Sequence, residues 1–148
     1  MKPNQDATVF PPADDSRGLG VGHFIVAHAA RYGFLEAVIL DKMILFAREL
    51  ADHFSRGEQV SQNPCEFYVR YAPADYCSSL PFVDKKDLRK ALARLLRRGA
   101  LTMDDGGHCH LSQHVLKQAA LAEPQYATPW ERENFGIAKP EHNYMSLY

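Results

Sequence analysis

The chain has 148 residues, of which 46% are hydrophobic and 24% charged, and its formal net charge is −1. This balance is typical of one soluble globular domain with a real core. It excludes a protein that is basic over its whole surface, so any attraction for phosphate must be local.

The first third of the chain predicts one long helix after an irregular leader. Residues 1–22 are rich in Pro and Gly and have little periodicity, and His23 to Ala30 are expected to begin a short strand or turn. From Phe34 to Arg56 apolar residues recur at three- and four-residue steps, which predicts a core helix long enough to leave room for a dimer face. Its apolar positions are Leu35, Val38, Ile39, Met43, Leu45, Phe46, Leu50 and Phe54.

A strand and a short helix are expected next. Residues Cys65 to Tyr71 (CEFYVRY) alternate in polarity, as a half-buried strand does. Pro73 to Leu80 fit a short helix with Pro in its first turn, and Pro81 to Val83 form a break before the following element.

A basic helix follows the break, in the stretch DKKDLRKALARLLRRGAL. Asp84 is its predicted N-cap and Gly99 its end. At 100° per residue the leucines share one arc with Ala91, and Lys and Arg side chains occupy the other. Asp84 to Arg98 hold seven basic residues against two acidic ones, a net charge of +5, so the rest of the chain carries −6. The charge is therefore segregated along the sequence.

Residues 100–111 (ALTMDDGGHCHL) predict a β-hairpin around the turn Asp104 to Gly107. One face of the hairpin collects Leu101, Met103, Cys109 and Leu111, and the other collects Thr102, His108 and His110. Ser112 is then the expected N-cap of a helix from Gln113 to Ala122.

The C-terminal residues 123–148 predict an extended arm, because they show neither helical nor strand periodicity. They contain more aromatic residues than disordered segments do, so the arm should pack on its own domain, a second subunit or a partner. Trp130, Phe135 and Tyr144 are the candidate partner-binding residues, since Trp and Tyr often dominate interfaces. The predicted division is thus 1–22 leader, 23–122 domain and 123–148 arm.

From Phe24 to Leu111 the order of elements resembles a winged helix-turn-helix domain. AVILDKMILFAREL is similar to its first helix, EFYVRY to its small strand, and the segment APADYCSSLPFVDKKDLRKALARLLRRGALTM to its short helix, turn, recognition helix and entry into the wing. This pattern of residues is similar to the DNA-binding domains of phage and plasmid replication initiators and replisome organisers. The resemblance implies an α+β, mainly α fold with a small β-hairpin wing, to which the C-terminal arm is appended.

The resemblance also implies roles for individual residues. Lys85, Lys86, Arg89 and Lys90 would face base edges in the major groove. Arg94, Arg97 and Arg98, further along the helix, would meet phosphates. Thr102, His108 and His110 would lie where a wing touches the backbone or minor groove. The tip of this wing departs from the pattern, because Asp104 and Asp105 stand where Lys or Arg is expected.

Enzymatic and metal-dependent functions find little support in the sequence. It contains no G-x-S-x-G, phosphate-binding Gly loop or H-E-x-x-H motif, so no catalysis and no cofactor are expected. His108, His110 and His114 lie near Cys109, but no spaced His-Cys quartet completes a metal site.

The sequence also indicates the cellular compartment of the protein. The three cysteines, Cys65, Cys77 and Cys109, are an odd and sparse set, which favours a reduced intracellular protein. No stretch approaches the roughly 20 apolar residues of a membrane span, and no signal peptide is visible. We therefore expect a cytoplasmic protein with no membrane partner.

Two functional hypotheses remain open. The first is a non-enzymatic protein that binds double-stranded DNA in replication initiation or transcriptional control of a phage or mobile element, and a homodimer is compatible with it. The second is a winged-helix protein-interaction module, such as a phage-encoded inhibitor of a host defence system of the anti-CRISPR kind. A third interpretation is that the basic face of the helix is only solvated and binds no partner.

Overall fold

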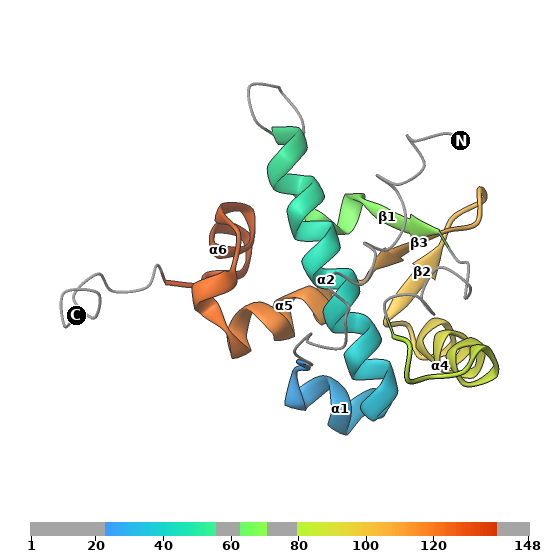
Figure 1. Cartoon of the computed structure of the whole chain (residues 1–148). Coiled ribbons are helices and arrows are strands. Elements are labelled where there is room, and N and C mark those ends of the chain that lie inside the picture. The colour runs from blue at the N-terminus through green and yellow to red at the C-terminus, as the bar shows by residue number, and fades with distance from the viewer. Residues whose placement is uncertain (1–22, 56–62, 71–79, 139–148) are drawn as a thin grey trace.

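The computed structural model describes residues 23–55, 63–70 and 80–138 (Figure 1). The predicted leader, the predicted helix from Pro73 as far as residue 79, and Tyr144 lie outside these residues. The helices are α1 (Val26–Tyr32), α2 (Phe34–Ser55), α4 (Lys85–Arg97), α5 (Gln113–Ala122) and α6 (Pro129–Phe135), with 3-10 turns η2 (Pro64–Glu66) and η3 (Pro124–Tyr126). The strands are β1 (Tyr68–Arg70), β2 (Leu101–Met103) and β3 (His108–Leu111). The predicted α+β, mainly α class is confirmed.

The strands form one small antiparallel sheet in the order β1-β3-β2. Cys109 in the central strand lies opposite both Val69 and Met103. The predicted hairpin is confirmed, and Gly107 takes a φ of +81° in its turn, a conformation that favours glycine. The predicted strand starts later than expected, because Pro64 begins a 3-10 turn and β1 begins only at Tyr68, and its predicted last residue, Tyr71, lies outside the described residues.

Helix α2 is the scaffold of the core, as its periodicity predicts. Ile39, Leu40 and Met43 are fully buried, and α1, α4 and η2 all pack against it. One residue of the predicted apolar stripe, Leu45, lies outside the buried face, since it is 51% exposed. Figure 1 shows α2 running through the middle of the molecule, with α1 and α4 near its first turns and α6 well away from α4.

The prediction of a strand or turn at His23 to Ala30 is wrong. From Val26 the segment forms helix α1, in which the buried His28 and Tyr32 are one helical turn apart, and the N-cap residue Ile25 packs on the core. Gly33 follows with a φ of +117° and allows α2 to start at once in a new direction. A strand would have needed alternation, whereas the buried residues Ile25, His28 and Tyr32 are three and four residues apart, as on a helix.

The prediction of an extended C-terminal arm is also wrong for residues 123–138. Thr128 caps α6 by accepting a hydrogen bond from the Glu131 N–H, and Pro129 occupies its first turn. Gly136 ends the helix in the left-handed conformation. These cap signals are present in the sequence, but a seven-residue helix is too short to show a period.

Candidate nucleic-acid interface

Helix α4 is fixed on the core by one face. Leu88, Leu92 and Leu95 have no exposed surface, and Asp84 caps the helix by accepting a hydrogen bond from the Asp87 N–H at 2.9 Å. Burying three leucines stabilises the domain by several kcal/mol, at about 1.5–3 kcal/mol each. The orientation of the opposite face is therefore set by packing and does not depend on a ligand.

Five basic side chains remain on the outer face of α4, and we call them the basic stripe: Lys85, Lys86, Arg89, Lys90 and Arg97. All five are exposed. Among the described residues none of them forms an ion pair, so their charges are not neutralised within that part of the protein. Lys86, Lys90 and Arg97 recur at helical spacing and follow one line along the helix.

Two further arginines, Arg94 within α4 and Arg98 at its C-cap, have structural partners that sequence reasoning missed. Arg94 forms an ion pair with Glu36, a buried carboxylate in the first turn of α2. Arg98 donates a hydrogen bond to the backbone carbonyl of Arg31 in α1, at 2.9 Å. The resemblance assigned both arginines to phosphates, but they tie the end of α4 to the α1–α2 corner. A signal is present in Glu36, an acidic residue on an otherwise apolar stretch of helix.

The polar face of the hairpin beside α4 is only partly exposed. Thr102 is exposed, but His108 and His110 are half-buried beside Tyr68 of β1, whose ring centroid is 3.9 Å from that of His108. His110 donates from Nδ1 to the Cys65 carbonyl, at 3.2 Å, and its Nε2 lies 3.1 Å from Asp104 Oδ2. The histidines therefore help to fix β1 and the turn on the hairpin.

The tip of the hairpin is acidic and structured. The Asp104 carboxylate accepts hydrogen bonds from the N–H groups of His108 and Gly106, at 3.0 and 2.9 Å. The His108 N–H, followed by the His110 side chain, holds the pKa of Asp104 below its usual range. Asp105 is exposed. Asp104 thus builds the turn, and both acids place negative charge where a wing would meet phosphate.

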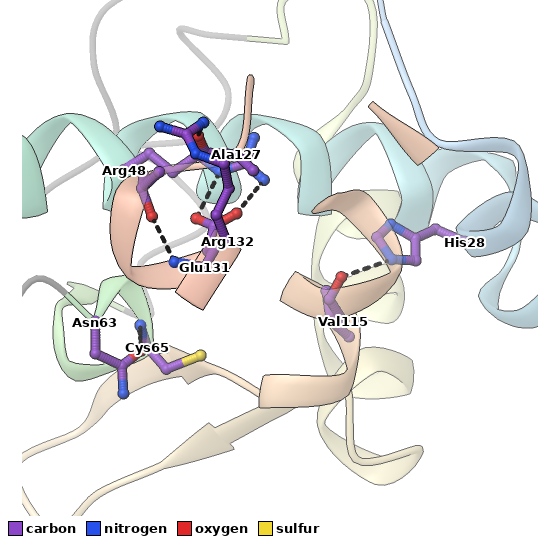
Figure 2. Close-up of polar contacts among 9 residues, drawn as sticks. His28, Arg48, Asn63, Cys65, Val115, Ala127, Glu131 and Arg132 are labelled. Carbon is purple, nitrogen blue, oxygen red and sulfur yellow. Dashed lines mark hydrogen bonds and ion pairs between the residues drawn. The ribbon is translucent and has the colours of Figure 1, made fainter. Parts of the chain in front are cut away.

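Two of the candidate partner-binding residues are packed within the chain. Trp130 and Phe135 form an edge-to-face pair, with ring centroids 5.5 Å apart, and pack against the main core. Figure 2 shows the contact that anchors their helix: Arg48 of α2 donates from Nε and Nη2 to the two carboxylate oxygens of Glu131, at 2.9 and 2.6 Å. Glu131 is fully buried. Helix α6 therefore belongs to the domain.

Neither described cysteine is set up as a nucleophile. Cys65 and Cys109 are free thiols, and burial raises their pKa values to about 12 and about 11. Cys77 lies outside the described residues. In residues 23–55, 63–70 and 80–138 no three His, Cys, Asp or Glu side chains are grouped so that they could hold a metal ion. The described helices include none that is long and apolar enough to cross a membrane.

Comparison with known proteins identifies no relative. No family model, no curated protein and no solved structure matches the chain. The geometry of the described residues is therefore the basis for a functional proposal.

Proposed function

We propose that the protein binds double-stranded DNA, without catalysis, through the basic stripe of α4. The observation that carries this proposal is a row of five exposed cations, none of them ion-paired with another described residue, on a helix whose opposite face is packed into the core. Holding like charges together on one rigid face costs electrostatic free energy, and an approaching polyanion relieves that cost. Phosphate is the natural partner of such a row.

The proposal extends to a winged helix-turn-helix architecture. Helix α2, strand β1, helix α4 and the β2–β3 hairpin follow one another in the order that the resemblance implies, and β1 pairs with the hairpin. In this architecture α4 is the recognition helix. Its first turns, with Lys86, Arg89 and Lys90, enter the major groove, where these cations reach base edges and neutralise the flanking phosphates, and Arg97 contacts the backbone.

The acidic tip of the hairpin limits which parts of the protein can contact DNA. Asp104 and Asp105 would be repelled by phosphates, so α4 makes the principal contact and the hairpin stays off the minor groove. With only about four phosphates neutralised, binding is moderate in affinity and strongly dependent on salt. Replication initiation or transcriptional control of a phage or mobile element is the biological setting that the family resemblance suggests.

A mobility-shift titration tests the proposal, with random and genomic DNA fragments at several salt concentrations. We expect the full chain to bind at low salt and the double variant Lys86→Ala, Arg89→Ala to lose binding with a nearly unchanged melting temperature. Lys117→Ala, an exposed cation on α5, is the matched control and should bind like the wild type. Absence of any shift at low salt would overturn the proposal.

A second candidate function rests on one specific observation, the exposure of Phe82. This side chain is 72% exposed in the turn just before the basic stripe, and Met103 of the hairpin is 42% exposed. Large apolar side chains beside charges are common in protein interfaces. A protein partner with an acidic surface would fit this mixture. Pull-down from host lysate with Phe82→Ser as the comparison tests this candidate: it predicts a partner that the variant loses and no DNA binding.

A further inference from the structure

A pocket of about 420 Å³ lies between α1 and α5, apart from the basic stripe. The residues of its lining that matter chemically are His28, Arg31 and Tyr32 from α1, and His114, Lys117 and Leu121 from α5. Pockets that hold small molecules have volumes of roughly 300–1,000 Å³ and combine apolar walls with a few converging polar groups. The size and the lining of this pocket satisfy both conditions.

One wall of the pocket carries a buried polar atom without a partner. His28 is only 1% exposed, and its Nε2 lies 3.1 Å from the backbone carbonyl of Val115 (Figure 2). A carbonyl oxygen can only accept, so Nε2 carries the proton and Nδ1 is an acceptor. Within the described part of the chain this Nδ1 has no hydrogen-bond partner. The atom is closed to solvent, so a ligand N–H or O–H group reaches it only when neighbouring side chains of the lining shift, and the new hydrogen bond would then satisfy it.

Burial keeps the His28 ring in the acceptor form. Desolvation, the largest cause, lowers the pKa of His28 below its ordinary value, so the ring is neutral near pH 7. A neutral ring that donates from Nε2 presents a lone pair at Nδ1. The His28 end of the pocket therefore favours a hydrogen-bond donor over an acceptor.

The rim of the same pocket is cationic. Arg31 and Lys117 are exposed, and the lining includes no acidic side chain among the residues that the structure describes. The Arg31 guanidinium lies 5.7 Å from the centroid of the Tyr32 ring, whose hydroxyl is 2.8 Å from Nε2 of His114. Two positive charges beside an aromatic and an aliphatic side chain suit an anionic group attached to a flat apolar body.

We propose that this pocket binds a small aromatic carboxylate that also carries a hydrogen-bond donor. The carboxylate would contact Arg31 and Lys117, and the donor would reach Nδ1 of His28. The ring would lie against Tyr32 and Leu121. This binding site is independent of the DNA-binding proposal, since it uses different helices and none of the basic stripe.

The test is a titration of the full-length isotope-labelled protein, followed by nuclear magnetic resonance, with 4-hydroxybenzoate as the probe. We expect saturable shifts of the His28 and His114 ring signals and of backbone amides in α1 and α5, with a dissociation constant on the order of 1 mM or tighter. Benzoate, which lacks the donor, and phenol, which lacks the carboxylate, should each bind at least about fivefold more weakly.

Two variants make the assignment specific. Arg31→Gln with Lys117→Gln changes exposed side chains only, so it should fold normally and weaken 4-hydroxybenzoate binding about tenfold or more. His28→Phe should remove the advantage of 4-hydroxybenzoate over benzoate. Lys86→Gln, in the basic stripe, is the control and should leave the titration unchanged. The proposal is overturned if 4-hydroxybenzoate causes no saturable shift up to about 20 mM, or if the Arg31 and Lys117 double variant binds as the wild type does.

Discussion

The basic side chains of this protein include two groups that carry the same charge. One group pairs with buried carboxylates, and the other is exposed to solvent. Arg48 and Arg94 each face a buried carboxylate, Glu131 and Glu36 respectively, and join helices that are far apart in the sequence. The basic stripe on α4 faces solvent and has no acidic partner in the described chain. The first group holds the fold together, and the second is available to a ligand.

The role of a cation in this protein therefore depends on what it faces. Arg94 and Arg97 lie three residues apart in one helix and are indistinguishable in a charge count. Three residues turn the helix by about 300°, so the two side chains point in directions about 60° apart. Arg94 turns toward α2 and meets Glu36, whereas Arg97 turns toward solvent.

Arg48→Met should have the largest effect on stability. It leaves the fully buried Glu131 carboxylate without its cation, which costs about 3–5 kcal/mol. Chemical denaturation followed by circular dichroism measures the loss. The double variant Arg48→Met, Glu131→Leu is the control, because it removes both charges and should recover most of the stability. A loss as large in the double variant as in the single one would show that the ion pair is not the cause.

Arg94→Gln and Arg97→Gln are a matched pair that tests the difference within one helix. Arg94→Gln leaves Glu36 buried without its cation and should destabilise the protein by about 1–3 kcal/mol. Arg97→Gln should change stability by less than about 0.5 kcal/mol and weaken DNA binding several-fold. Thermal unfolding measures the stability of both variants, and fluorescence anisotropy measures their DNA binding. Equal stability of the two variants would remove the distinction drawn between these arginines.

Asp105→Lys probes the acidic tip of the hairpin. If the tip repels DNA, replacing its exposed carboxylate by an ammonium should strengthen binding, roughly 3- to 10-fold at low salt. Asp105→Asn, which removes charge without adding any, should have a smaller effect in the same direction. Asp104 is left intact because its carboxylate forms the turn. Unchanged affinity in the Lys variant would mean that the tip lies far from the bound DNA.

The smallest predicted effect concerns His23, a cationic group that becomes neutral as pH rises. Its ring nitrogens lie 2.8 Å from carboxylate oxygens of Asp41 and Glu123, and the hydrogen bonds to Glu123 and then Asp41 raise the pKa of His23. A raised histidine pKa contributes stability that is complete below the unfolded value of about 6.5 and is lost as pH rises through the folded value.

His23 is 44% exposed, so solvent screening keeps this contribution below about 1 kcal/mol. Burial raises the pKa of Asp41. Protonation of this carboxylate therefore ends its charge interaction with His23 on the acidic side of the pH range. The difference in unfolding free energy between wild type and His23→Gln should therefore be larger near about pH 6 than near about pH 9. A difference that is the same at both values would show that the histidine contributes no charge interaction.

Prediction from sequence succeeded where periodicity or capping chemistry was strong. The α2 stripe, the α4 cap at Asp84 and the Gly-containing hairpin turn all follow from local patterns. It failed where elements are short. Helices α1 and α6 have seven residues each, too few for a period to stand out, and tertiary contacts decide their conformation.

The candidate site was predicted only in part. The exposed cations of α4 follow from the amphipathic pattern, but the pairing of Arg94 with Glu36 and of Arg48 with Glu131 joins residues 58 and 83 positions apart. No local rule connects residues at that separation. The pocket between α1 and α5 cannot be foreseen either, because the sequence of α1 is too short to display a helical period.

The most direct test of DNA binding by the basic stripe is its salt dependence. Fluorescence anisotropy with a labelled duplex, from about 50 to 200 mM salt, gives the slope of log K against log salt concentration. About four phosphate contacts from the basic stripe predict a slope near about −3.6 for the wild type. In the triple variant Lys86→Gln, Arg89→Gln, Lys90→Gln the slope should fall to about −0.9, with an unchanged melting temperature. Equal slopes in the two proteins, or no binding at about 50 mM salt, would contradict binding through this stripe.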